Sequence, residues 1–179
     1  MEERNNIILI GMPASGKSTV GVILAKILGM DFVDTDIVIQ QREGARLNEI
    51  IDAQGVEGFL KKEEQALFSI KASHTVIATG GSAVYSDPGM KYLSEGSKIV
   101  YLKVELEDLK KRLKDIKLRG VVLRSGESLE TMYENRTRLY EKYADISIAE
   151  QDGSIEDTVQ AVLNALSKVR FENRNTNDQ

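Results

Sequence analysis

The sequence predicts an α/β fold in which helices cover both faces of a parallel sheet. Short apolar runs alternate along the whole chain with longer segments that have apolar residues at helical spacing, a pattern typical of βαβ units. Between the first such run and the first such segment, residues 11–18 fit the pattern G-x-x-x-x-G-K-[ST]. The 179 residues contain no internal repeat and no linker. They predict one domain over residues 1–169, which ends with a helix, and a polar, disordered tail over 170–179.

Residues 11–18 have the sequence context of a phosphate-binding loop. The apolar run 6–10 before them predicts a buried strand, and the segment after them predicts an amphipathic helix that Gly29 ends. Glycine permits backbone turns that a side chain would obstruct, and the N–H groups at a helix start attract an anion. We therefore expect a nucleoside triphosphate here, with Lys17 on its β- and γ-phosphates and Ser18 on Mg²⁺. The loop residues assigned to the nucleotide are Gly11, Ala14, Ser15, Gly16, Lys17, Ser18 and Thr19.

Two carboxylates follow the second short strand, which is expected at residues 31–34. They are Asp34 and Asp36. Because open α/β sheets bind ligands at the carboxyl ends of their strands, Asp34 would help Ser18 to hold Mg²⁺, and Asp36 would face a substrate hydroxyl. The alternative is an N-cap and a surface aspartate that open the next helix, and the spacing does not separate these two interpretations.

The middle of the chain predicts three helices. Residues 46–54 and 56–72 predict two of them, with Gly55 as an interruption, and Pro88 opens a short third helix. Glu63 falls near the apolar stripe of the second helix, so it is either a structural or a site carboxylate.

Three further strands are expected at residues 75–79, 98–103 and 145–148. The first of them runs into Gly80 and Gly81. Two glycines directly after a strand indicate either close approach of the backbone to a ligand or a simple tight turn.

Residues 105–117 and 129–143 predict helices, and the periodicity lapses in the segment 117–128 between them. Loops of about this length without regular structure are often lids over a site. The segment contains Arg119, which would act as an internal arginine finger on the phosphates. It also contains Arg124, for which we prefer a solvated surface position.

Composition and charge exclude several classes of function. The net charge of -4 argues against a nucleic-acid-binding surface, and the absence of cysteine excludes disulfides and zinc–thiolate sites. The one histidine, His74, is expected at the surface or in a turn and makes no metal cluster alone. No apolar run approaches the roughly 18–20 residues that span a membrane, and residues 1–6 lack the apolar core of a signal peptide. We expect a cytoplasmic monomer without nucleic-acid or membrane partners.

These features together favour a small-molecule kinase. A phosphate-binding loop alone indicates only that a nucleotide binds. The carboxylates at 34 and 36 are placed to orient an acceptor hydroxyl, and a lid with arginines would exclude water, which otherwise competes as acceptor. Phosphoryl transfer needs mainly this positioning and charge neutralisation.

The order of motifs resembles the shikimate kinase family over residues 7–148. None of the motifs after residues 11–18 is specific to this family by itself, but the whole set in this order and with these spacings is specific. The set comprises residues 11–18, Asp34 with Asp36, Phe59-x-x-x-Glu63, Ala78-Thr-Gly-Gly81, Arg119, Arg136-x-x-Leu-Tyr140 and Ala144-Asp-Ile146. The resemblance implies a three-layer P-loop kinase fold with a five-stranded parallel sheet in the order 2-3-1-4-5. It also implies a mobile lid, the cofactors ATP and Mg²⁺, and phosphoryl transfer to a shikimate hydroxyl in aromatic amino acid biosynthesis.

The same resemblance implies roles for single residues. On the nucleotide side these are Lys17 and Ser18 at the phosphates and Mg²⁺, Asp34 behind the metal, Arg112 on the adenine and Arg119 over the phosphates. On the acceptor side they are Asp36 as hydroxyl ligand and candidate base, Gly80 and Gly81 in the pocket wall, and Arg136 at the substrate carboxylate. Lys17, Asp36 and Arg119 would be the catalytic residues.

The acceptor side departs from the family pattern. Leu60 stands where the family motif Phe-Arg-x-x-Glu has a substrate-binding arginine, and the loss of one charge-assisted contact costs about 1.5–3 kcal/mol. Ser82 replaces a glycine, while Gly120 and Arg138, the latter otherwise a surface residue, replace prolines. Two alternatives therefore stay open: a kinase of another small polyol or hydroxy acid, and a nucleotide-binding regulatory protein with weak catalysis.

Overall fold

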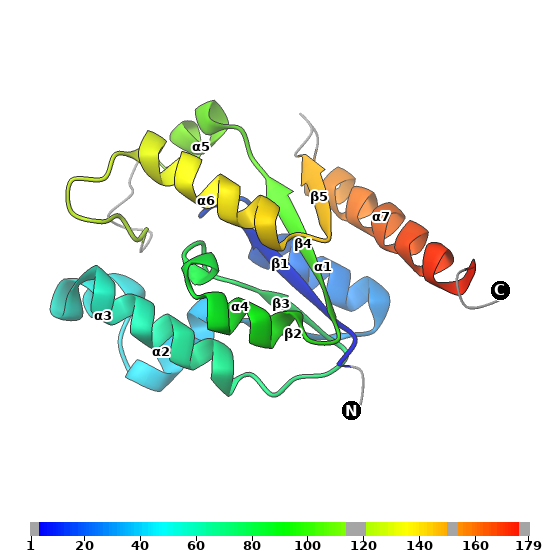
Figure 1. The fold of residues 1–179 in the computed structure, drawn as a ribbon, viewed down its shortest axis with the longest axis horizontal. Helices are drawn as coiled ribbons and strands as arrows, with labels where there is room; N and C mark the ends of the chain where they lie inside the picture. The colour runs from blue at the N-terminus through cyan, green and yellow to red at the C-terminus, as the bar shows by residue number, and fades with distance from the viewer. Residues whose placement is uncertain (1–3, 114–120, 150–153, 176–179) are drawn as a thin grey trace.

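The computed structural model of the protein describes residues 4–113, 121–149 and 154–175. Five parallel strands form one sheet in the order β2-β3-β1-β4-β5, with helices on both faces (Figure 1). The strands are β1 (Asn6–Gly11), β2 (Asp31–Asp34), β3 (Thr75–Ala78), β4 (Ser97–Lys103) and β5 (Ile146–Ala149). The predicted fold class and strand order are confirmed.

The central strand β1 is buried along its whole length. It pairs with β3, where Leu9 lies opposite Ala78, and with β4, where Leu9 lies opposite Val100. Its continuous apolar run is typical of a parallel strand that is covered on both faces. Because successive side chains point to opposite faces, Ile8 packs in one core cluster and Ile7 in the other.

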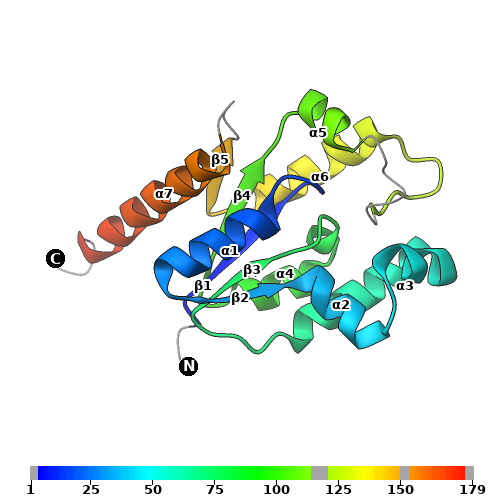
Figure 2. The same cartoon turned by 180° about the vertical axis from the view of Figure 1, so that it is seen from behind.

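Helices form the outer layers of the molecule. They are α1 (Lys17–Leu28), α2 (Thr35–Glu43), α3 (Leu47–Ser69), α4 (Asp87–Ser94), α5 (Leu106–Arg112), α6 (Leu129–Tyr143) and α7 (Ile155–Asn175), with a short 3₁₀ helix η1 (Ala83–Tyr85). Helices α1 and α7 cover one face of the sheet, while α4, α6 and the end of α3 cover the other (Figures 1 and 2). Within the described ranges, no helix combines the length and the apolar character that crossing a membrane requires.

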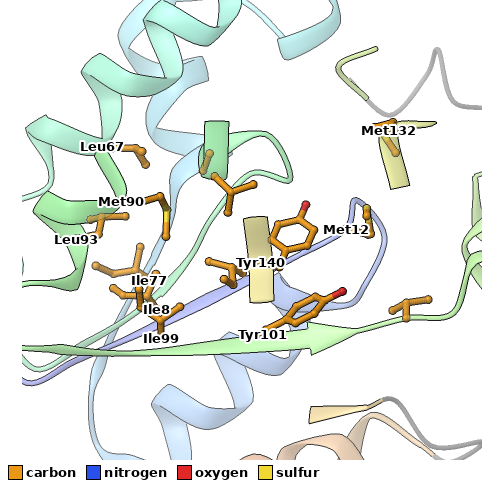
Figure 3. Packing of buried hydrophobic residues seen from close by; sticks show 14 of the residues in the cluster. Ile8, Met12, Leu67, Ile77, Met90, Leu93, Ile99, Tyr101, Met132 and Tyr140 are labelled. Carbon is orange, nitrogen blue, oxygen red and sulfur yellow. The ribbon is translucent and has the colours of Figure 1, made fainter. Parts of the chain in front are cut away.

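The larger core layer lies between the sheet and helices α3, α4 and α6 (Figure 3). Side chains of three neighbouring strands meet those of the helices here, and the main contributors are Ile8, Ile77, Ile99, Leu67, Met90 and Leu93. Towards the other end of this layer, the rings of Tyr101 and Tyr140 lie with their centroids 5.0 Å apart. This packing fixes α6 on the sheet, and α6 contributes a charged side chain to the site described below.

On the opposite face, α1 packs unusually close to the sheet. A Cβ atom at Gly21 would lie 2.6 Å from the ring of Phe32 and 3.3 Å from Leu9, so only glycine permits this approach. The position of α1 matters because its first turn continues directly from the loop after β1.

The helix boundaries refine the sequence-based expectations. Gly55 interrupts α3 with φ 70° and ψ 175°, as its place between two helical stripes predicts. Helix α5 ends at Arg112, earlier than the expected 117, and residues 114–120 lie outside the described part. Helix α7 runs on to Asn175, although residues from 170 were expected to be disordered. No glycine or proline interrupts residues 170–175, so the backbone can continue the helix after its apolar stripe has ended.

We predict that Leu24→Ala lowers the free energy of unfolding by about 2–5 kcal/mol, because it leaves a cavity under α1. Leu24 is fully buried, at 0% exposure, while Ile27 on the same helix is 56% exposed. Ile27→Ala is the matched control and should change stability by no more than about 0.5 kcal/mol. Urea denaturation followed by circular dichroism measures both changes. Equal losses in the two variants would contradict the assigned packing of α1.

Candidate active site

A cavity of about 300 Å³ lies at the carboxyl edge of the sheet. The segments that follow β1, β2 and β3 border it, because parallel strands bring their carboxyl ends to the same edge. Helices α3 and α6 and the segment before α6 complete its wall. The polar and charged side chains that line it are Lys17, Ser18, Thr19, Asp36, Glu63, Thr79, Ser82 and Arg136.

The loop between β1 and α1 has the backbone of an anion-binding turn. Gly16, the N-cap of α1, adopts φ 80°, a left-handed conformation that favours glycine. A Cβ atom at Gly11 would lie 2.6 Å from the carbonyl oxygen of Leu102, so a side chain there would push the loop away from β4. Among the described residues, no side chain caps the N–H groups at the start of α1. These donors are therefore available to phosphate oxygens.

Lys17 is buried, at 7% exposure, and folds back onto this loop. Its Nζ donates hydrogen bonds to the carbonyl oxygens of Gly11 at 2.9 Å and Met12 at 2.7 Å, and to Ser15 Oγ at 3.3 Å. Burial lowers the pKa of Lys17 to about 8, although the carboxylates of Asp36 and Asp34 act in the opposite direction. An anion in the cavity would stabilise its charged form and offer stronger acceptors than the loop carbonyls do.

Asp34 makes two hydrogen bonds that join the starts of α1 and α2. Its Oδ2 accepts a hydrogen bond of 2.6 Å from Ser18 Oγ, and its Oδ1 accepts one of 2.9 Å from the N–H of Asp36. It therefore caps α2 and at the same time stands beside the hydroxyl at the start of α1. Together Ser18 and Asp34 present hard oxygen atoms, the ligands that Mg²⁺ prefers.

Asp36 is half-buried and faces the cavity instead of lying on the surface. Burial, followed by the neighbouring Asp34 carboxylate, raises the pKa of Asp36 to about 6, while the charge of Lys17 acts against this shift. A carboxylate with a raised pKa, within a cavity that also contains a phosphate-binding lysine, is suited to accept a proton from a hydroxyl group.

Glu63 is a second carboxylate in the same cavity, 2% exposed. Its Oε2 accepts a hydrogen bond of 2.6 Å from Ser82 Oγ, whereas its Oε1 has no partner within the described residues. Burial raises the pKa of Glu63 to about 7, Ser82 opposes this shift, and Asp36 adds to it. A Cβ atom at Gly80 would collide with Glu63 Oε1 and lie 2.7 Å from Asp36 Oδ1. Gly80 therefore leaves space for the two carboxylates at the point where they converge.

Arg136 reaches the cavity from α6 and is almost completely buried, at 1% exposure. Its Nη2 donates to the carbonyl oxygen of Val122, and its Nε donates to the hydroxyl of Tyr85 at 3.3 Å. Tyr140, one turn further along α6, donates to the carbonyl oxygen of Gly81 at 2.6 Å. These bonds hold α6 against the segment after β3 and aim a guanidinium group at the acceptor end of the cavity.

The other predicted residues are placed as follows. Arg112 Nη1 donates to the carbonyl oxygen of Ala14 at 3.2 Å, which puts this side chain beside the phosphate-binding loop. Arg119 lies outside the described residues. Arg124 and Arg138 are exposed, and so is His74, which lies in a bend before β3. The described part of the proposed lid, residues 121–128, contains no helix or strand.

Some residues at the site had no signal in the sequence. Tyr85 and Val122 bind Arg136, but they lie far from it along the chain, and neither follows a recognisable pattern. Thr79 is part of the motif Ala78-Thr-Gly-Gly81 but has no predicted role; it lines the cavity, and its hydroxyl donates to the carbonyl oxygen of Leu9 at 3.0 Å. Such contacts cannot be predicted from the sequence, because they join residues from different elements and each residue type is common in the element where it lies.

Comparisons with known proteins agree with this arrangement. A family model described as shikimate kinase matches residues 13–167. Shikimate kinase of Histophilus somni (strain 2336) is 34% identical over 175 residues, which cover 96% of this chain and 100% of that protein. Shikimate kinase of Vibrio parahaemolyticus serotype O3:K6 is 36% identical over 171 residues, which cover 94% and 99%. The solved structure of shikimate kinase from Acinetobacter baumannii in complex with shikimate has a TM-score of 0.84 and 30% identity, covering 92% of this chain and 93% of that one.

The family match covers nearly all of the site described above. It includes most of the phosphate-binding loop, the carboxylates after β2, the glycines after β3 and Arg136 on α6. The similarity to the related solved structure also extends to the sheet and both helical layers. This chain therefore belongs to the shikimate kinase family, whose members are ATP-dependent small-molecule kinases.

Proposed function

We propose that this chain transfers the γ-phosphoryl group of ATP to a hydroxyl group of shikimate. The observation that carries the proposal is one cavity that contains both the phosphate-binding Lys17 and the acceptor-side residues Asp36 and Arg136. A donor phosphate and an acceptor hydroxyl can therefore meet in one space. The relatives named shikimate kinase, at 34% and 36% identity, support shikimate as the acceptor.

On the nucleotide side, the N–H groups at the start of α1 and the ammonium group of Lys17 bind the phosphates. Ser18 and Asp34 would hold Mg²⁺, which would supply charge neutralisation at the phosphates. The described residues contain no group of three or more acidic or histidine ligands. The two oxygen donors of Ser18 and Asp34 fit Mg²⁺, which is usually held by one or two protein oxygens together with phosphates and water. The residues assigned to the nucleotide stay those of the loop, Gly11, Ala14, Ser15, Gly16, Lys17, Ser18 and Thr19, together with Arg112 and Arg119.

On the acceptor side, Asp36 binds the attacking hydroxyl group and takes its proton. Gly80 and Gly81 leave room for the ring, and the guanidinium group of Arg136 pairs with the substrate carboxylate. Arg119 closes over the phosphates, a role that rests on the family resemblance alone. As part of the same proposal, the active unit is a monomer and the reaction takes place in the cytoplasm.

The first prediction concerns the reaction itself. With ATP and Mg²⁺, the purified protein should release ADP when shikimate is added, with kcat on the order of 1–100 s⁻¹ as in other kinases. Chelation of Mg²⁺ should abolish this turnover. A coupled assay of ADP release measures it, with a panel of polyols and hydroxy acids in parallel. Turnover with another acceptor only would refute shikimate as substrate, and tight ATP binding without any turnover would favour a regulatory protein.

The second prediction concerns the base. Asp36→Asn should lower kcat by about 10²–10⁴-fold, because the hydroxyl group loses its proton acceptor, while the dissociation constant of ATP stays within about twofold. Steady-state kinetics and calorimetric ATP titration measure the two quantities. Asp31→Asn, at an exposed position of β2, is the matched control and should behave as the wild type. Unchanged kcat in Asp36→Asn would remove Asp36 from this role.

The third prediction concerns pH. If the Asp36 carboxylate must be ionised, kcat/KM for shikimate should fall about tenfold per pH unit below about pH 6, the raised pKa of this group. Glu63→Gln separates the two carboxylates, because the pKa of Glu63 is about 7. The fall below pH 6 should persist in this variant. Its disappearance would assign the titration to Glu63 instead.

A further inference from the structure

A second cavity, of about 210 Å³, adjoins the acceptor end of the active site. The two cavities share Glu63 and Ser82 in their walls, so they are direct neighbours. Leu60 of α3, Tyr85 of η1 and Arg124 also line this second cavity. Arg124 comes from the segment between α5 and α6, which lies beside α3 here (Figure 1).

The ring of Tyr85 brings two guanidinium groups into one neighbourhood. The Cζ atom of Arg136 lies 5.2 Å from the ring centroid, and that of Arg124 lies 5.0 Å from it. Both distances are within the range of a cation–π contact. Tyr85 also accepts a hydrogen bond from Arg136 Nε, so its position relative to the active site is set. A guanidinium group held on this ring lies next to the pocket that Arg136 serves.

The ion pair that the Arg124 side chain makes with Glu57 is weak. Its Nε lies 4.0 Å from Glu57 Oε1, and the two side chains are 55% and 79% exposed. Such an exposed pair contributes little, so the guanidinium group is able to exchange this carboxylate for another. The backbone of Arg124 is better held, because its N–H donates to Glu127 Oε2 at 3.1 Å and its carbonyl accepts from the N–H of Glu127 at 2.9 Å.

The wall of the second cavity is mainly acidic, so a carboxylate would bind there only beside a cationic side chain. Glu57, Glu63 and Glu64 line it, and Leu60 adds no charge. A carboxylate that entered from the first cavity would meet Arg136 and then this acidic wall. Arg124 and Lys61 are the two cationic side chains among the described lining residues. Of these, Arg124 contacts the ring of Tyr85, as Arg136 does, and its planar group can bind a carboxylate through two parallel hydrogen bonds.

We propose that Arg124 is a specificity-determining residue that binds the carboxylate of the acceptor substrate together with Arg136. This assignment rests on the proposed function, because it takes shikimate as the acceptor. It replaces the surface role that the sequence favoured for Arg124. It also explains how a pocket with Leu60 in place of a cation retains two guanidinium groups for one carboxylate.

The test measures steady-state kinetics of Arg124→Gln. KM for shikimate should rise about tenfold or more, the loss of one charge-assisted hydrogen bond, while kcat and KM for ATP stay within about twofold. Arg124→Lys should retain part of the affinity, because it keeps the charge but loses the planar fork. Arg138→Gln removes an exposed arginine of α6 and is the matched control, with kinetics equal to those of the wild type.

Two further measurements separate charge pairing from a structural effect. The methyl ester of shikimate has no carboxylate, so Arg124→Gln should leave its KM unchanged. Leu60→Arg introduces a guanidinium group on the wall of the same cavity and should restore a low KM for shikimate in the Arg124→Gln background. An equal rise of KM for the acid and the ester would overturn the assignment.

The remaining outcomes also decide between the proposals. An unchanged KM for shikimate in Arg124→Gln, with a rise in Lys61→Gln, would assign the carboxylate to Lys61 and overturn the inference while the proposed function stands. If the wild-type protein does not phosphorylate shikimate, the proposed function fails, and the assignment of Arg124 fails with it.

Discussion

The parallel pairing of β1 with β3 and β4 is the constraint on which the whole site depends. Because β1 is central, its carboxyl end lies between those of its two neighbours, and the phosphate-binding loop emerges there. The same pairing sets Gly11 against the carbonyl of Leu102 and places Gly80 beside the carboxylates of Asp36 and Glu63. An antiparallel neighbour would send its following loop to the opposite edge of the sheet. The parallel arrangement of the strands therefore brings the residues of the nucleotide side and the acceptor side to the same edge of the sheet.

Burial of charge is the second organising feature. Lys17, Asp36, Glu63 and Arg136 line one cavity, and burial disfavours the charged form of each ionisable group that leaves water. The protein compensates with loop carbonyls around Lys17, the hydroxyl of Ser82 on Glu63, and a carbonyl and a phenol on Arg136. One oxygen of Glu63 is left without a partner in the described structure. Such an arrangement suits a site that completes its hydrogen bonds with a ligand better than one built for stability alone.

The two halves of the site differ in how they are built. The nucleotide half is local, since the loop after β1 and the first turn of α1 supply most of its groups. The acceptor half is assembled from α2, α3, η1, α6 and the segment before α6, and it includes Leu60. When a residue in one of these elements is substituted, a side chain from another element that borders the same cavity can take over its contact. The role proposed for Arg124 is such a compensation, since Arg124 contacts Tyr85 and lines the same cavity as Leu60.

The sequence by itself determined the fold class, the strand order through its family resemblance, the phosphate-binding loop and the carboxylates after β2. These depend on short-range patterns: apolar periodicity, glycines at turns, and the order of motifs along the chain. The tertiary structure decided that Asp34 is both a helix cap and a neighbour of Ser18, and that Glu63 is a buried site carboxylate. It also decided which residues hold Arg136, and that the exposed side chain of Arg124 contacts the ring of Tyr85. These contacts join residues that are far apart in the chain, so they follow from the packing of helices on the sheet and not from any local pattern.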